Sequence, residues 1–178
     1  MPVDPGRFRA VMARWPTGVT IVTAQENGRD TGLTVNAFLS VSLTPPLVLV
    51  SLTHDADATP VIRRTRSFAI SILAHDQREI SERFAKVVAP AEKFAHLPVR
   101  RGRDGLALID GALATLECTV VHEFDLADHH LYIGEVVQAD VHRDDAPLLF
   151  YRSRYAEMTG PETVKLAPPD PAPTRQSH

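Results

Sequence analysis

The sequence is poor in cysteine and in long apolar runs, and each shortage excludes a class of protein. Cys118 is the single cysteine among 178 residues, so no disulfide can form within the chain. No apolar run approaches the length of a membrane-spanning helix, and no signal-peptide pattern opens the sequence. We therefore expect a soluble, cytoplasmic protein that has no membrane partner.

Neither sign of charge dominates the chain. The formal net charge is −3 at pH 7, so no overall basic field favours nucleic acid, and we expect no nucleic-acid partner. Arginines cluster at 63–66 and 100–103, where a solvated face is the simpler explanation and a small phosphate-bearing ligand the alternative. The apolar fraction of 44% is ordinary for a globular domain.

The domain organisation follows from composition. Residues 1–160 have the mixed composition and the length of one domain that buries its own core. From residue 161 the chain is rich in proline and polar residues. We predict one folded domain over 1–160 and a disordered Pro-rich tail over 161–178.

Several common catalytic and binding motifs are absent from the sequence. It contains no G-x-G-x-x-G, no P-loop, no G-x-S-x-G and no Cys/His spacing typical of a metal site. Asp128, His129 and His130 are consecutive, but neighbours on a strand point to opposite faces, so we predict no metal site there. Cys118 lies in the apolar run 116–121, which favours a buried, inert thiol over a nucleophile.

Most of the chain has the pattern of β-strands. Asn27-Gly28 is the strongest hairpin signal, because both residues tolerate positive φ. The predicted strands do not alternate with helices in the βαβ manner, so a mainly β barrel is expected rather than a parallel sheet. We predict strands over 18–24, about 31–43, 47–52, 68–73, about 112–122, 130–142 and 148–151.

A few helices accompany these strands. One is predicted to begin after Asp4 and to end before Pro16, and a short one covers 58–65. Asp76 with Glu79 resembles a capping box, and the helix that follows would place Ile80, Phe84 and Val87 on one face. Residues 90–110 are predicted to form a long irregular segment.

The segment 34–43 alternates with a period of two. Its odd positions are apolar, and we predict that they face the core: Val35, Ala37, Leu39, Val41 and Leu43. Its even positions carry small hydroxyls, an amide and a ring, with no charge: Thr34, Asn36, Phe38, Ser40 and Ser42. Such a face suits a flat heteroaromatic ligand such as a flavin, and the alternatives are a second buried face or a subunit contact.

More hydroxyls follow this segment. Ser51 and Thr53 end the next strand, and Thr59 precedes Pro60 at the start of the short helix. Thr59 and nearby backbone N–H groups are suited to a phosphate, with Arg63 or Arg64 adding charge. Capping of the helix by Thr59 is the alternative, and the two roles are compatible.

Seven ordered segments carry a family resemblance. They are WPTGVTIVT at 15–23, GLTVNAFLSVSL at 32–43, PPLV at 45–48, SERFA at 81–85, EKF at 92–94, DH at 128–129 with Gly134, and LLFYRSRY at 148–155. Over roughly residues 6–157 the sequence resembles the short-chain flavin reductases, the reductase components of two-component flavin-dependent monooxygenases.

The resemblance implies a fold and an activity. The fold is a mainly β split barrel, a Greek-key antiparallel barrel with a few flanking helices, usually a homodimer. The activity is reduction of FMN or FAD by NADH or NADPH, with hydride transfer to flavin N5, and the partner is a monooxygenase that receives the reduced flavin. Other readings are a split-barrel oxidase, such as one acting on pyridoxamine phosphate, and a flavin carrier or sensor without turnover.

The resemblance also implies site residues. Around the flavin ring it places Thr34, Val35, Asn36, Ala37, Phe38 and Ser40. For the ribityl chain and phosphate it implies Ser51, Leu52, Thr53 and Thr59, with Phe84 packed nearby.

The family's Gly-Asp-His element, linked to nicotinamide nucleotide binding, reads Ala127-Asp128-His129 here. The resemblance implies that Asp128 contributes to this site and that His129 holds the nicotinamide over the flavin as the catalytic residue, the alternative being an ordinary turn histidine. If the family glycine has positive φ, Ala127 is strained. His130 has no assigned role. Arg152 and Tyr155 match the C-terminal motif, where nicotinamide contacts are expected, although plain strand-end residues are the alternative.

Overall fold

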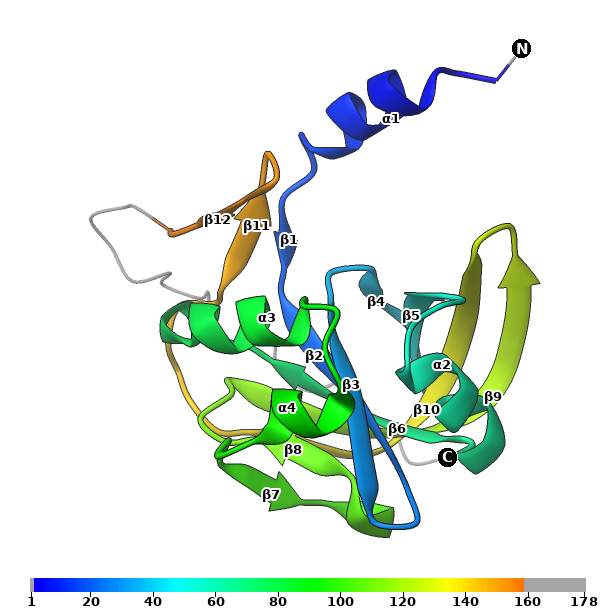
Figure 1. The fold of residues 1–178 in the computed structure, drawn as a ribbon, viewed down its shortest axis with the longest axis vertical. Coiled ribbons are helices and arrows are strands. Elements are labelled where there is room, and N and C mark those ends of the chain that lie inside the picture. The colour runs from blue at the N-terminus through cyan, green and yellow to red at the C-terminus, as the bar shows by residue number, and fades with distance from the viewer. Residues whose placement is uncertain (1, 159–178) are drawn as a thin grey trace, which may run out of the picture.

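The computed structural model describes residues 2–158, and β-strands dominate it (Figure 1). The strands are β1 (Thr17–Gly18), β2 (Thr20–Glu26), β3 (Arg29–Val35), β4 (Phe38–Leu43), β5 (Pro46–Thr53), β6 (Ser67–Ile72), β7 (Val99–Arg101), β8 (Ala107–Ile109), β9 (Ala114–Leu126), β10 (His129–Val141), β11 (Leu149–Tyr151) and β12 (Arg154–Ala156). The helices are α1 (Pro5–Met12), α2 (Ala58–Thr65), α3 (Arg78–Phe84) and α4 (Pro90–Phe94), with 3-10 turns η1 (His75–Gln77) and η2 (Arg103–Gly105).

Seven strands form one antiparallel sheet in the order β3-β2-β6-β9-β10-β5-β4. Strand β3 at one edge also contacts β5, so the sheet curves strongly. The predicted fold class, a mainly β split barrel with few flanking helices, is confirmed. The Asn27-Gly28 hairpin is confirmed too: it joins β2 to β3 with φ of 51° and 78° at these residues.

Two small sheets complete the fold. Strands β1, β11 and β12 form one, and β7 and β8 form the other. In Figure 1 the first small sheet lies below α1, between that helix and the main sheet. Leu148 and Val19 hold it to the main sheet, because the Val19 N–H donates to the Leu148 carbonyl at 3.1 Å and both side chains are buried.

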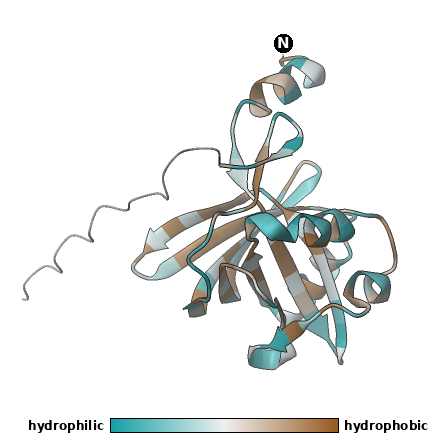
Figure 2. Ribbon diagram, turned by 90° about the vertical axis from the view of Figure 1, so that its left-hand side faces the viewer, coloured by the Kyte–Doolittle hydropathy of each residue, from teal (hydrophilic) through white to brown (hydrophobic). Residues whose placement is uncertain are grey.

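The core occupies both faces of the main sheet at β2, because the neighbouring residues Ile21 and Val22 are both buried and belong to different clusters. One cluster lies beneath α2 and includes Val22, Val50, Phe68 and Tyr132. A second cluster lies beneath α3 and α4 and includes Ile21, Leu73 and Phe84. Figure 2 shows brown, apolar segments alternating with paler ones along the strands.

Helix α1 stands clear of the rest of the molecule in both views (Figures 1 and 2). It begins as predicted, with the Asp4 carboxylate accepting from the Arg7 backbone N–H at 2.9 Å. None of its residues is buried, and Phe8, Val11 and Met12 are exposed on it, with Trp15 exposed just beyond its end.

The expectation for 34–43 was wrong in two respects. The segment is not one strand, because the chain leaves the sheet at Asn36 and Ala37, between β3 and β4. Leu39, Val41 and Leu43 are exposed, since β4 is an edge strand that pairs with β5 alone and its odd-numbered side is not covered. Phe38 instead packs against the core cluster beneath α2.

Two further expectations need correction. Residues 90–110 are not irregular: they contain α4, η2 and the β7–β8 pair. Asp76 does not cap α3, because its carboxylate pairs with Arg143 at 3.1 Å, and Val87 is fully exposed beyond the end of that helix. The Pro-rich tail at 161–178 lies outside the described residues. Within 2–158, no helix is long and apolar enough to cross a membrane.

Candidate functional site

A cavity of about 700 Å³ lies where the β3–β4 turn, β5 and the small sheet of β1, β11 and β12 meet. Its lining contains the rings of Trp15, Phe38, Phe150 and Tyr151 and the polar side chains of Asn36, Ser51 and Arg152. The fold thus brings residues from four separate parts of the sequence to one surface. Trp15, Phe150 and Tyr151 were not among the predicted site residues, although each lies in a segment that carries the family resemblance.

The turn at Asn36 and Ala37 builds one wall of this cavity. The Ser51 N–H donates to the Ala37 carbonyl at 3.0 Å, which fixes the turn against β5. Both turn residues are exposed, so the Asn36 amide faces the cavity beside Ser51. Ser40 is exposed on β4 but is not part of the lining.

The turn between β11 and β12 builds the opposite wall. Arg152 and Ser153 have φ of 50° and 58°, the conformation of a tight hairpin turn. The Arg152 N–H donates to the Ala13 carbonyl at 2.9 Å, and its guanidinium lies 5.2 Å from the Tyr151 ring centroid. A cation is therefore held at the rim of the cavity.

This combination fits a flat heteroaromatic ligand such as a flavin. The rings offer faces for stacking, while an amide, a hydroxyl and a guanidinium offer both donors and acceptors to a polar edge. A volume of about 700 Å³ is within the usual size of small-molecule sites.

His129 lies on the same face of the main sheet as Ser51 and Thr53. It pairs directly with Thr53, and Leu131 pairs with Ser51. Directly paired residues share a face, and so do residues two apart. His130 faces the other side, as expected from strand geometry.

The β9–β10 turn consists of Ala127 and Asp128. Ala127 has a φ of 53°, so the strain expected at this position is present. The Asp128 carboxylate lies 2.8 Å from His129 Nδ1. A hydrogen bond from His129 is the main cause that lowers the pKa of Asp128, and this contact orients the imidazole.

Tyr155 and Thr34 meet at a different place, on α3. The Thr34 hydroxyl donates to the Ser81 carbonyl at 2.6 Å, and the Tyr155 hydroxyl lies 2.9 Å from Ser81 Oγ. Arg78 lies over the Tyr155 ring at 5.0 Å. Neither Thr34 nor Tyr155 belongs to the cavity lining, so both hold the small sheet and β3 against α3.

Four predicted site residues have buried side chains: Val35, Leu52, Thr59 and Phe84. Phe84 packs edge-on against Phe94 with 5.0 Å between ring centroids, within the core. These side chains therefore belong to the core, and the ligand contacts that the resemblance implies for Val35, Leu52 and Thr59 stay predictions. Thr59 does not cap α2: Asp57 holds the N-cap position, and the Thr59 hydroxyl donates to the Thr53 carbonyl at 2.9 Å.

Cys118 is buried in the core, as predicted. Burial raises the pKa of its thiol to about 12, so it is not a nucleophile at neutral pH.

A larger cavity of about 1020 Å³ lies between the β2–β3 hairpin, α2 and α4. Of the candidate residues named from the sequence, Arg64 alone lines it. Three of its charged side chains are already paired, Arg64 with Glu26 at 2.7 Å and Asp30 with Arg101.

Comparison with known proteins gives a consistent result. The family model described as "Flavin reductase like domain" matches residues 12–159. An "NADH-dependent flavin reductase" from Rhodococcus sp. is 42% identical over 159 residues, which cover 88% of each chain. The reductase component of a 4-nitrophenol 4-monooxygenase/4-nitrocatechol 2-monooxygenase from Rhodococcus opacus is 38% identical over 154 residues, covering 86% of this chain and 81% of that protein.

A solved structure shows the same fold. The NADH:FAD oxidoreductase SgcE6 from Streptomyces globisporus C-1027 superposes with a TM-score of 0.83 at 33% identity. The match covers 90% of this chain and 98% of that one.

Proposed function

The chain belongs to the flavin reductase-like family, and on that premise we propose that it reduces FMN or FAD with NADH and supplies the reduced flavin to a monooxygenase. NADH is the preferred donor in this proposal, because the Rhodococcus sp. and Streptomyces relatives are named for it. The monooxygenase partner is supported by the Rhodococcus opacus relative, which is named as a reductase component.

The observation that carries the proposal is the cavity that joins Asn36, Ser51 and Arg152 with four aromatic rings. A bound flavin supplies N5 as the hydride acceptor. The protein then has to stack the ring, orient its polar edge and exclude water, which this lining is built to do. Paired carboxylates or an activated nucleophile are not needed for hydride transfer.

We assign the nicotinamide contact to His129. It lies on the same face of the sheet as Thr53 and Ser51, and Ser51 lines the proposed flavin cavity. Asp128 acts as a positioning residue, because its carboxylate holds His129 Nδ1 at 2.8 Å. Arg152 at the cavity rim provides the cation for a phosphate or for the electron-rich edge of a bound ring.

A homodimer is part of the proposal. The sheet face that carries Ser51 and His129 also exposes Leu39, Phe124 and Leu126, which are 52%, 49% and 54% exposed. Helix α1 adds further exposed apolar side chains. Apolar patches of this kind mark subunit contacts more often than free surface. Cytoplasmic location stays a prediction from the sequence.

The experiment is oxidation of NADH in air by the purified chain, followed at the nicotinamide absorbance band with and without added FMN or FAD. We expect rapid oxidation that requires flavin. Flavin binding without oxidation of NADH or NADPH would leave a flavin carrier or an oxidase of another substrate, and would overturn the proposal.

Two variants test the assigned residues. His129→Ala is expected to lower kcat or raise the KM for NADH about tenfold or more, and unchanged values of both would refute its role. Asn36→Ala is expected to weaken flavin binding about fivefold, since one hydrogen bond contributes about 1 kcal/mol. His122→Ala, an exposed histidine on β9, is the control for both.

A further inference from the structure

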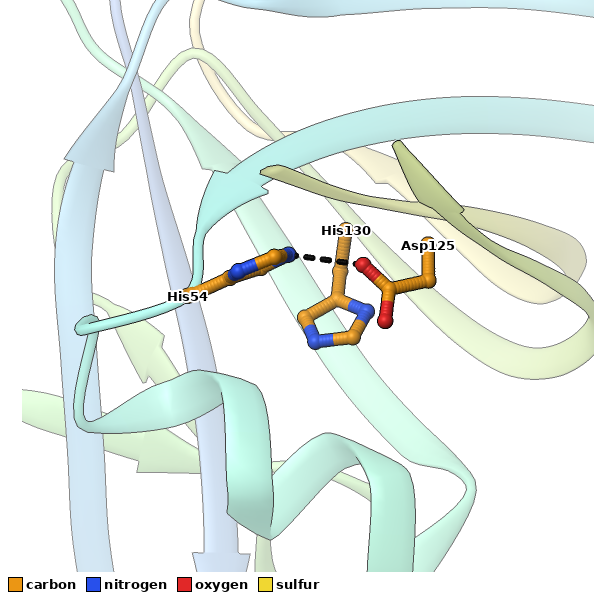
Figure 3. Close-up of side chains that lie close together, drawn as sticks. All are labelled: His54, Asp125 and His130. Carbon is orange, nitrogen blue, oxygen red and sulfur yellow. Dashed lines mark ion pairs between the residues drawn. The ribbon is translucent and has the colours of Figure 1, made fainter. Parts of the chain in front are cut away.

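His130 is the histidine for which the family resemblance gives no role, and the structure places it in a cluster. Its ring lies 4.4 Å from the ring of His54, measured between centroids. His54 Nε2 lies 2.8 Å from an oxygen of Asp125. Figure 3 shows the three side chains converging from the loop after β5, from β9 and from β10.

These three side chains have the donor set of a metal site. Each offers one ligand atom, and the three atoms lie within 4.8 Å of one another. Two imidazole nitrogens and one carboxylate oxygen are preferred ligands of divalent zinc, cobalt and nickel. Bonds of about 2.0–2.2 Å place tetrahedral ligands about 3.4 Å apart, so His54 and Asp125 need only a small side-chain movement.

The surroundings hold the donors in place and leave them free for a metal. His130 lies against Tyr132, whose hydroxyl donates to the Thr59 carbonyl at 3.0 Å. The His54 N–H donates to the Asp128 carbonyl at 3.1 Å, which ties its loop to the β9–β10 turn. The neighbouring Arg63 and Arg66 form ion pairs with Glu123 rather than with Asp125.

We propose that His54, Asp125 and His130 bind one divalent transition metal of the zinc class, with water completing its coordination. The metal joins the loop before α2 to the β9–β10 hairpin that carries His129. The site is on the opposite face of the sheet from His129 and does not depend on the proposed flavin reduction.

The test uses the full chain without a histidine tag, freed of metal with a chelator and titrated with Zn²⁺ in a calorimeter. We expect one Zn²⁺ per chain. His54→Ala, His130→Ala and Asp125→Asn should each weaken binding more than about tenfold, because each removes a ligand. The matched control is His122→Ala, which removes an exposed histidine of β9 outside the cluster and should bind Zn²⁺ as the wild type does.

Two further measurements make the outcome decisive. Co²⁺ in the same site should give the visible absorption of an imidazole complex, lost in His130→Ala. Zn²⁺ at hundredfold excess over Kd should raise the Tm of the wild type by about 5–10 °C and leave that of His130→Ala unchanged. No heat of binding, or equal affinity in the wild type and in all three ligand variants, would overturn the proposal.

Discussion

At the scale of single residues, Ala127 adopts a backbone conformation that is strained for a residue with a Cβ. Its φ of 53° is left-handed, which costs a residue with a Cβ about 1–2 kcal/mol. Ala127→Gly should therefore stabilise the fold by about 0.5–1 kcal/mol, after the greater chain entropy of glycine is subtracted. The measurement is the urea midpoint at unchanged m value.

Ala139→Gly is the matched control for this change. Ala139 is exposed on β10 and has no positive φ, so glycine there should lower stability by about 0.5–1 kcal/mol. Equal losses in the two variants would show that Ala127 is not strained. The NADH KM of Ala127→Gly would also report whether this departure from the family pattern affects the nicotinamide site.

Gly134 is required for a different reason, namely space. A Cβ built there would lie 2.6 Å from Phe68 Cζ and 2.8 Å from Cys118 Cβ, both inside the core. Gly134→Ala should destabilise the protein by about 1–3 kcal/mol, as overpacking of a core does. Gly18→Ala, where nothing lies within 4 Å of the new Cβ, should have almost no effect on the thermal midpoint. A Gly134→Ala protein as stable as the wild type would contradict this packing.

At the scale of elements, local signals predicted local structure well. Helix α2, the Asn27-Gly28 turn and the start of α1 depend on neighbours in sequence, and all three are confirmed. The covered side of 34–43 depends instead on which strands lie beside it. Since β4 pairs only with β5, its period of two could not show which face is buried.

The candidate site divides in the same way. Asn36, Phe38, Ser51 and Arg152 line the cavity, whereas Phe84 and Leu52 are core residues, and the ligand contacts of all six stay predictions. A motif match does not separate residues that contact a ligand from residues that support the site. The His54, Asp125 and His130 cluster could not be predicted, because two hairpin residues meet a loop about 70 positions away in sequence.

Tyr155 connects three elements and gives a test at this scale. Its hydroxyl reaches Ser81 on α3, and Ser81 accepts from Thr34 on β3. Tyr155→Phe should cost about 1 kcal/mol and increase hydrogen exchange in β12, while the sheet core stays protected. Tyr151→Phe is the control, because the Tyr151 hydroxyl makes no hydrogen bond within residues 2–158. Equal hydrogen exchange in β12 of the two variants would show that the Tyr155–Ser81 hydrogen bond does not hold β12 in place.

At the scale of the whole molecule, the apolar surface is concentrated on one face of the sheet and on α1. A helix of eight residues with none buried is marginal by itself, so α1 requires a partner surface to be stable. The exposed face of β4, β5, β10 and β9 is the surface available for a second copy of the chain. The same face carries Ser51 and His129, so dimerisation would cover the cofactor side of the sheet.

Leu39→Glu tests whether this face forms the dimer contact. Leu39 is half exposed on the edge strand β4, so its replacement should leave the fold of the monomer intact. We expect the wild type to sediment as a dimer and the variant to dissociate at least about tenfold more readily, since a charge would be buried in the contact. Val87→Glu changes an equally apolar but isolated residue beyond α3 and should leave the dimer intact.

A wild-type chain that sediments as a monomer at every concentration, or a Leu39→Glu dimer of undiminished affinity, would show that this face does not form the contact. In that event α1 would have to be covered by another protein, and the partner monooxygenase would be the first candidate to test by co-sedimentation.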